Sequence, residues 1–343
     1  MTRFSRGCSR YRACSAEGNA RVEKDMDTIN DLIHRSLWED YDDVSEFPSQ
    51  TPLLAHYTSV KNFDYIIEDE EIWFSNPLNM NDLDEMVFGM NQGAAEFRAN
   101  EVLIEACGSE KIFGQLLHYF DHYFNQFDEK HVLDTYISCF SWHDKDDFDG
   151  DLSMWRGYGA NGDGVAFVID TKQIEPNEES PLILSSVKYV TKESRIEWIK
   201  HKIHSLAELL KEQEKSDEVL NAIAWYWIER LKVFSLFTKH IGFKEENEWR
   251  FVYLNDRDHE GLFSSMFGYN ISKKGVEPKL KLKLSQIPGM NTPLSLDGLI
   301  DRIILGPTVS SELSMRSVRR MLQIKGKSEL SNRVFASTIP YRP

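Results

Sequence analysis

An α+β fold built around an antiparallel or mixed sheet is the class that this sequence predicts. Strand-forming and helix-forming stretches follow one another without the regular strand–helix–strand repeat of a parallel sheet. The glycine-rich stretch "GYGANGDG", residues 157–164, contains no lysine and opens no helix, so it is typical of neither a P-loop nor a dinucleotide-binding turn. We therefore expect one sheet with helical insertions.

Residues 26–343 are predicted to form a single domain, because no Pro/Ser-rich linker and no repeat interrupts them. The chain of 343 residues is long enough for one large domain or two of middle size. Residues 1–25 are rich in arginine and serine and lack an apolar stretch, which predicts a disordered basic tail and not a secretory signal. Met1 and Met26 are both candidate starts.

The elements of the first half follow from periodicity. An amphipathic helix is expected over residues 26–41, and an extended run, "PLLAHYTS", follows at 52–59. The spacing of apolar residues predicts a helix over 60–70, and "EIWFSNP" reads as a short strand that ends at a proline. Asn81 or Asp82 is a plausible N-cap for the next helix, and residues 94–130 form the first helical insertion.

The second half contains most of the predicted strands. "YISCFSW" and "GVAFVID" are rich in β-branched and aromatic residues, and the second is apolar enough to be central. "LILSSVKYV" is expected to be one strand, followed by a second helical insertion over 193–238. Further strands are expected at "KLKLKL", "LIDRIILGP" and "RVFASTIPYR", with a final helix over 312–324.

Composition and charge indicate which kinds of partner and compartment the sequence disfavours or fits. The formal net charge is −15, which disfavours general binding to the phosphate backbone of nucleic acids. No stretch approaches the roughly 18 apolar residues of a membrane span. The four cysteines, Cys8, Cys14, Cys107 and Cys139, form no CxxC pair and no zinc spacing, which fits a reducing cytoplasm.

The stretch "FKEENEWRF", residues 243–251, alternates charged and aromatic residues. In a strand, Trp249 and Phe251 would face one side, and Glu246, Glu248 and Arg250 would face the other. Two interpretations stay open. The charged side chains form a salt-bridged strand face, or they line a cleft in which neighbouring carboxylates shift each other's pKa.

Other polar residues carry alternatives of the same kind. His56 near a strand end, followed by Tyr57 and Thr58, is either a hydrogen-bond donor in a site or a partly buried structural histidine. The acidic loop "HDKDDFDGD" suggests a metal through Asp144, Asp146 and Asp149, but its register does not fit an EF-hand and a solvated loop is the alternative. His118 and His122 lack the glutamate of a zinc-binding HExxH helix.

Taken together, several motifs resemble a bacterial family, domain of unknown function 2971. They are "HYTSVKNFDYIIEDEEIWFSNPLNMND", "ISCFSW", "SMWRGYGANGDGVAFVID", "KHIGFKEENEWRFV", "IILGP" and "FASTIPYR". The resemblance extends from about Leu53 to Arg342 and implies no activity.

A more distant similarity is to ADP-ribosyltransferases, which implies a split β-sandwich that cleaves NAD. His56-Tyr57-Thr58 resembles their first motif, "SCFS" their serine-containing strand, and "ENE" their Glu-x-Glu. The resemblance implies that Glu248 stabilises the oxocarbenium-like ribose and that Glu246 positions the acceptor. The residues implied to bind NAD, without a metal, are His56, Tyr57, Thr58, Trp73, Ser138, Ser141, Tyr158 and Arg250.

Three functions therefore stay open. The first is transfer of ADP-ribose from NAD to an unknown macromolecular acceptor, or NAD hydrolysis, in a toxin or phage-defence effector. The second is a non-catalytic binding or regulatory module with a structural Glu–Arg pair. The third is a metal-dependent hydrolase. The first predicts that His56, Ser141 and Glu248 lie around one concavity.

Overall fold

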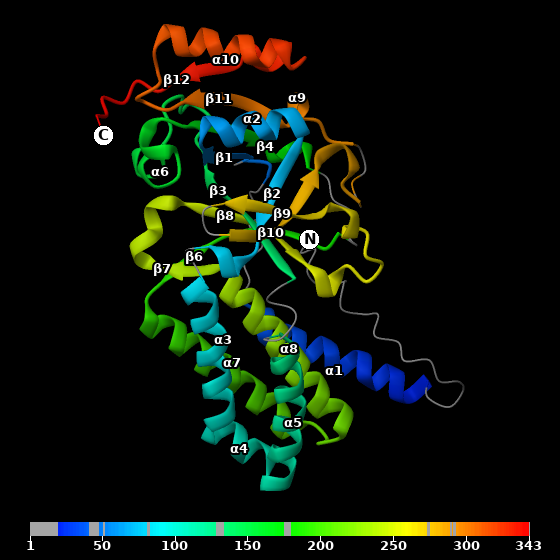
Figure 1. Cartoon of the computed structure of the whole chain (residues 1–343). Coiled ribbons are helices and arrows are strands. Elements are labelled where there is room, and N and C mark those ends of the chain that lie inside the picture. The colour runs from blue at the N-terminus through cyan, green and yellow to red at the C-terminus, as the bar shows by residue number, and fades with distance from the viewer. Residues whose placement is uncertain are drawn as a thin grey trace. The chain divides into compact units, whose positions relative to one another are not determined.

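The computed structural model describes residues 20–40, 48–50, 52–80, 83–127, 134–174, 180–272, 275–288, 290 and 293–342, with the backbone alone at 20–28, 83–86 and 272. These residues belong to two compact units, whose elements are labelled in Figure 1. The first comprises 1–43, 80–134 and 188–241, and the second comprises 44–79, 135–187 and 242–343. The two stretches predicted as helical insertions thus supply most helices of the first unit.

The first unit is helical. Its elements are α1 (Ala20–Trp38), α3 (Leu83–Ala99), α4 (Glu101–Cys107), α5 (Glu110–Gln126), α7 (Lys192–Glu212), α8 (Asp217–Leu236) and the parallel strand pair β6 (Lys188–Val190) and β7 (Thr238–His240). Helix α8 contacts α1, α3 and α5. Its side chains are buried along almost the whole helix, which is the pattern of a central helix.

Local sequence explains where several of these helices begin. Ser109, Thr191 and Ser216 each accept a hydrogen bond from the backbone N–H three residues ahead, which satisfies one of the free donors at a helix N-terminus. Helix α1 begins at Ala20, so residues 20–25, which the sequence assigns to a disordered tail, are helical. The predicted caps Asn81 and Asp82 lie outside the described residues.

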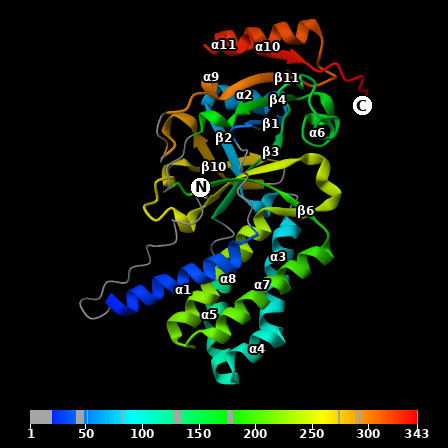
Figure 2. The ribbon, with the colours of Figure 1, turned by 180° about the vertical axis from the view of Figure 1, so that it is seen from behind.

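The second unit contains the large sheet. Its strands are β1 (Leu53–Thr58), β2 (Glu71–Ser75), β3 (Thr135–Trp142), β4 (Val165–Asp170), β5 (Leu182–Ser186), β8 (Glu248–Leu254), β9 (Phe267–Ser272), β10 (Gly275–Lys283), β11 (Ile300–Leu305) and β12 (Val334–Ala336). Its helices are α2 (Val60–Asp69), α6 (Leu152–Gly157), α9 (Leu296–Leu299), α10 (Glu312–Ile324) and α11 (Ser328–Ser331). The same elements are seen from behind in Figure 2.

The sheet is mixed, as predicted. Its strand order is β12-β11-β4-β1-β3-β2-β10-β9, and β8 and β5 extend from β3 on a separate branch. All pairs in this sheet are antiparallel except β11 with β12. Helices and a mixed sheet in one chain confirm the α+β class.

Strand β3 is the branch point of the sheet. One of its edges pairs with β8 along the whole strand, from Thr135↔Leu254 to Ser141↔Glu248. The other pairs with β1 only at Leu54↔Trp142 and Ala55↔Ser141, and with β2 only at Ser75↔Ile137. The sheet therefore divides between β1 and β2.

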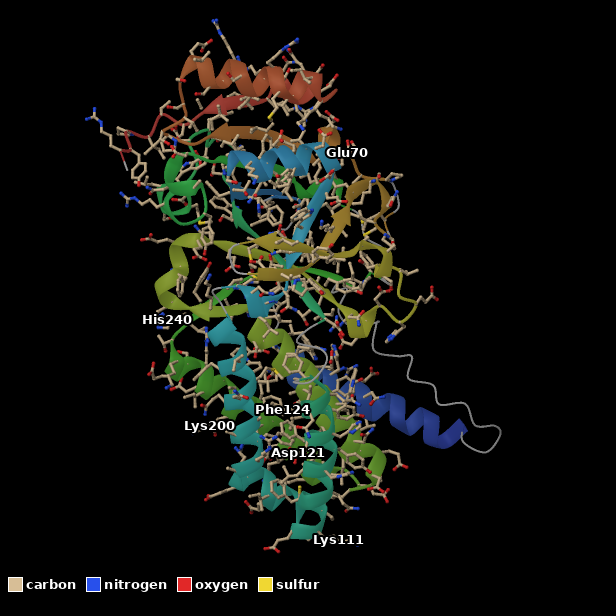
Figure 3. All side chains as sticks on the ribbon, in the orientation of Figure 1. Glu70, Lys111, Asp121, Phe124, Lys200 and His240 are labelled. Atoms are coloured by element: carbon tan, nitrogen blue, oxygen red, sulfur yellow. The ribbon has the colours of Figure 1, made fainter. Side chains whose placement is uncertain are left out.

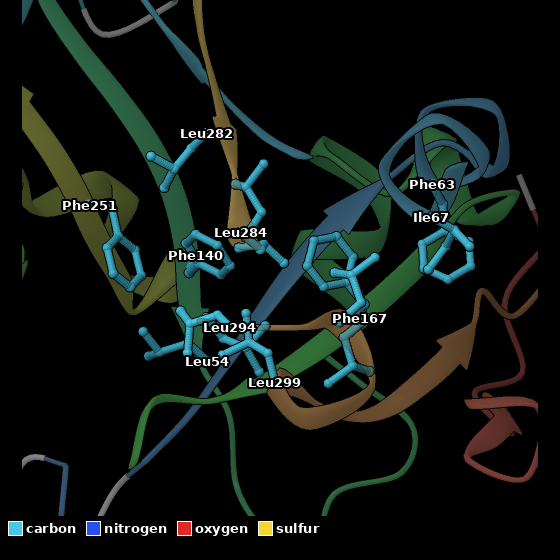
Figure 4. Packing of buried hydrophobic residues seen from close by; sticks show 14 of the residues in the cluster. Leu54, Phe63, Ile67, Phe140, Phe167, Phe251, Leu282, Leu284, Leu294 and Leu299 are labelled. Carbon is cyan, nitrogen blue, oxygen red and sulfur yellow. The ribbon is translucent and has the colours of Figure 1, made fainter. Parts of the chain in front are cut away.

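A large hydrophobic core covers one face of this sheet. Phe140 and Phe251 meet at 5.3 Å between ring centroids, and Leu54, Phe167 and Phe63 belong to the same cluster (Figure 4). A smaller cluster covers the opposite face of β1, β4 and β11, where Tyr57 packs against Trp155 of α6. The faces of β1 thus differ, with Leu54 and His56 on one and Ala55 and Tyr57 on the other.

Two expectations about strands require correction. "LILSSVKYV" forms two strands, β5 and β6, because the backbone changes partner at Val187. The N–H of Val187 donates to the backbone carbonyl of Glu248, and the N–H of Lys188 donates to the backbone carbonyl of Phe237. The predicted strand at residues 243–251 begins only at Glu248, since Ile241–Glu246 form a 3₁₀ helix.

Candidate functional site

The Glu-x-Glu motif lies at the junction of a 3₁₀ helix and strand β8. Asn247 has a backbone φ of 41°, a left-handed conformation that interrupts the extended alternation. Glu246 therefore belongs to the turn, and only Glu248 and Arg250 share a strand face. The expectation that all three charged residues form one row was wrong for this reason.

Glu248 and Arg250 form a buried ion pair. The Arg250 Nε donates to Glu248 Oε1 at 2.7 Å, and a terminal guanidinium nitrogen donates to Oε2 at 3.1 Å. Each residue is 4% exposed. A bidentate pair of this kind engages both carboxylate oxygens, and removing either partner would take this contact away from a buried charge.

The register of the sheet separates Glu248 from His56. Ala55 pairs with Ser141, and Ser141 pairs with Glu248, so these three side chains project from the same face. His56 follows Ala55 directly and packs with Phe140 in the core of the opposite face. The two backbones are two strand spacings apart, about 10 Å. The structure brings the strands together but directs the two side chains to opposite faces.

His56 lies where β1 and β3 separate. The imidazole Nδ1–H donates to the Cys139 carbonyl at 2.9 Å, which takes the place of the backbone pairing that stops at Ala55. Its ring lies 5.2 Å from those of both Phe140 and Phe167. Burial lowers the pKa of His56, and the hydrogen bond to Cys139 opposes that shift. These contacts fit a neutral histidine at the division of the sheet.

The neighbours of His56 also have local partners. The Tyr57 hydroxyl accepts a hydrogen bond from the backbone N–H of Asp151 at 2.8 Å, and burial raises its pKa. The Thr58 hydroxyl accepts from the Asn62 amide at 3.2 Å. Both contacts hold loops or helices against β1.

The two serines of "SCFS" are buried and unpartnered. Ser138 is 3% exposed and Ser141 is 4% exposed, and neither hydroxyl oxygen has a hydrogen-bond partner. They lie on opposite faces of β3, because Ser138 pairs with the core residue Phe251 and Ser141 pairs with Glu248. Ser141 thus shares the face of the ion pair, and Ser138 does not.

Trp73 and Tyr158, the aromatic residues predicted to contact NAD besides Tyr57, contact different neighbours. Trp73 donates to Glu71 at 3.0 Å, and the Lys281 ammonium lies 4.2 Å from the centre of its ring. The Tyr158 hydroxyl donates to Glu246 at 2.9 Å, and Tyr158 is 45% exposed. The Glu246 carboxylate therefore contacts the segment that follows α6.

The acidic loop does not assemble a metal site. Asp144 accepts from the backbone of Asp146 at 2.8 Å, and Asp149 accepts from the Thr338 hydroxyl at 2.9 Å. No group of three potential metal ligands occurs among the described residues. Within that part of the chain, the carboxylates instead organise turns and bind the C-terminal segment.

Two residues of this face were not anticipated. Cys139 of β3 and Ser185 of β5 pair with Arg250 in the register of the sheet. Their positions depend on pairing between strands far apart in the sequence, and no local pattern indicates it. Cys139 is not part of a disulfide.

Comparison with known proteins finds a match to a family model. Residues 154–251 match the model described as "Protein of unknown function (DUF2971)". Over this segment the chain is similar to the DUF2971 family. The matched segment runs from α6 into β8 and includes Glu246, Glu248 and Arg250, and it lies within the longer span of the predicted resemblance. No curated protein and no solved structure matches the chain.

The described helices were also compared with the requirements of a membrane span. None of the helices that the structure describes is both long and apolar enough to cross a bilayer.

Proposed function

We propose that this protein is a non-catalytic binding or regulatory module in which Glu248 stabilises the sheet. The observation that carries the proposal is the bidentate contact between Glu248 and Arg250, with both residues 4% exposed. A carboxylate that stabilises an oxocarbenium ion must face the ribose at the reacting bond. Here both carboxylate oxygens are engaged by a guanidinium, and His56 points to the opposite face.

The test is consumption of NAD by the purified protein, followed as nicotinamide release, alone and with cell lysate or nucleic acid as acceptor. We expect no release above the level of Glu248→Gln, and we expect that variant to lose stability. Nicotinamide release that depends on Glu248 would overturn the proposal.

ADP-ribosyl transfer is the second candidate, and the neighbourhood of the three motif strands favours it. The His56, Ser141 and Glu248 strands are adjacent in the order β1-β3-β8, and β1 and β3 separate at His56. This arrangement supports the interpretation as a split β-sandwich of the ADP-ribosyltransferase kind. NAD would then be the substrate, and the acceptor a macromolecule of a toxin or defence system.

The two candidates differ in the effect of single substitutions. For a transferase, Glu248→Gln should lower turnover by about 10²–10³-fold with little effect on NAD affinity. His56→Ala should instead weaken NAD binding. For a non-catalytic module, neither substitution has any turnover to change.

A further inference from the structure

An open groove lies between helices α2 and α10 of the second unit. It has a volume of about 1020 Å³ and is lined by Ile67, Glu68, Glu70, Arg316, Ser317, Arg320, Met321, Ile324, Lys325, Gly326 and Lys327. Glu70, at the C-terminal end of α2, marks one side of it (Figure 3). None of the predicted NAD-binding residues lines this groove.

Basic side chains gather in this groove, although the chain carries a net charge of −15. Arg316, Arg320, Lys325 and Lys327 line it, and neighbouring carboxylates contact three of the four. Lys325 contacts Glu68 and lies 3.1 Å from Asp64. Lys327 contacts Glu70 and lies 3.0 Å from Asp297. The lysines therefore connect the two helices and neutralise the acidic wall.

The two arginines remain as the groove's binding groups. Arg316 and Arg320 are four residues apart on α10, which places them on the same helix face. Arg316 contacts Glu312 at 2.9 Å in a highly exposed pair, which contributes little energy. Arg320 donates to Gln323 at 3.5 Å, a long contact between two exposed side chains. Two adjacent guanidinium groups are thus available to one anion, and guanidinium forks suit phosphate oxygens.

Part of the groove's lining is apolar. Met321 is half-buried and Ile324 is 72% exposed at the edge, whereas Ile67 is 1% exposed and offers a ligand little surface. A groove of this size with apolar walls and a few charged groups matches a small-molecule site. A bare anion would leave the apolar wall uncovered, so the occupant should carry an apolar or aromatic part beside its negative charge.

We propose that this groove binds a nucleoside diphosphate or a similar phosphate ester, with Arg316 and Arg320 on the phosphates and the base against Ile324. The inference does not depend on the proposed function of Glu248. The test is isothermal titration of the purified chain with ADP, inorganic pyrophosphate and adenosine. We expect ADP to bind more tightly than pyrophosphate, and adenosine to show no binding at matched concentrations.

Variants of exposed residues assign the binding to the groove. Arg316→Ala and Arg320→Ala should each weaken ADP binding by about 10-fold or more, the usual effect of losing a hydrogen bond to a charged group. Ile324→Ser should weaken ADP binding and leave pyrophosphate binding unchanged. The matched control is Arg35→Ala, an exposed arginine of α1, which should change neither. Unchanged melting temperatures verify that the variants are folded.

Several outcomes would overturn the inference. One is the absence of ADP binding by the wild-type protein at millimolar concentration, and another is unaltered ADP binding by the Arg316→Ala/Arg320→Ala double variant. NAD also contains a diphosphate, so the same variants are titrated with NAD. If the double variant loses NAD binding and His56→Ala keeps it, NAD binds in the groove. If His56→Ala loses NAD binding and the double variant keeps it, NAD binds at the sheet, which counts against the groove.

Discussion

Replacing Glu248 with glutamine removes the negative charge opposite Arg250 and keeps the size of the side chain. Breaking a buried ion pair from one side costs about 3–5 kcal/mol, because the remaining charge stays buried and loses its counter-charge contact. Glutamine retains one oxygen that can accept from Arg250, so we expect the lower end of that range, a loss of about 3 kcal/mol in the free energy of unfolding. The double variant Glu248→Gln/Arg250→Met removes both charges and should recover at least about 2 kcal/mol relative to the sum of the single variants.

The assay is urea unfolding followed by tryptophan fluorescence. Trp249 lies between the two residues in β8 and is 6% exposed, and it contributes to the summed emission of the chain's eight tryptophans, which follows unfolding. The control is Glu312→Gln, which breaks the exposed pair with Arg316 and should cost less than about 1 kcal/mol. A Glu248→Gln variant as stable as the control, or additive effects in the double variant, would refute a structural role for the pair.

Three further predictions concern stability. Burial alone would raise the pKa of Asp40, but Lys202, Arg230 and Trp198 outweigh it and hold the pKa well below its usual range. The folded pKa of Asp40 lies below the unfolded value of about 3.9, so its contribution to stability is present above about pH 4 and is lost as the pH falls further. In Asp40→Asn, the free energy of unfolding should therefore decrease less steeply below about pH 4, as measured by urea unfolding at a series of pH values. Burial lowers the pKa of His56, so the unfolded chain binds its proton more readily, and stability should fall as the pH decreases below about 6.5, an effect that His56→Gln should abolish. Ser141→Ala removes a buried hydroxyl without a partner and should leave the free energy of unfolding unchanged or raise it by up to about 1 kcal/mol. The control Ser331→Ala loses a 2.6 Å hydrogen bond to the Ser328 carbonyl and should lower the free energy of unfolding by about 1 kcal/mol. Equal losses in the two variants would contradict the conclusion that the Ser141 hydroxyl has no hydrogen-bond partner.

Elements with a strong local pattern could be predicted from the sequence. Helix α10 occupies residues 312–324, as its apolar spacing predicts, and β4 is the buried central strand that "GVAFVID" indicates. Trp249 and Phe251 pack into the core, as the alternation within β8 predicts. In each case one short stretch contains both the periodicity and the apolar side chains that determine the outcome.

The candidate site could be predicted only in part, because its geometry depends on two features without a local signal. The first is the left-handed conformation of Asn247, which removes Glu246 from the strand. The second is the pairing of Ala55 with Ser141 and of Ser141 with Glu248, which sets the face of each side chain. A shift of this register by one residue would have placed His56 on the face of Glu248. The order of the motifs along the chain is the same in the observed register and in the shifted one, so motif order does not predict which face each side chain occupies.

The position of the ion pair leads to a last prediction, about sequences of the family. The matched segment includes both Glu248 and Arg250, and their contact is between side chains two residues apart on one strand face. Whether the chain binds a ligand or transfers ADP-ribose, an unpaired arginine at this buried position is costly. Family members that replace Glu248 with a neutral residue should therefore also replace Arg250.

An alignment of family members tests this dependence. Coupled loss of the two charges is expected if the pair maintains the sheet. A catalytic glutamate predicts a different pattern, in which Glu248 is retained by active members while Arg250 varies freely, because the arginine then contributes no transition-state contact. Members that keep Arg250 opposite a neutral residue, with no new carboxylate on the neighbouring positions of β3 and β5, would contradict the structural interpretation, since the buried guanidinium would have lost the Glu248 contact without a replacement on these strands.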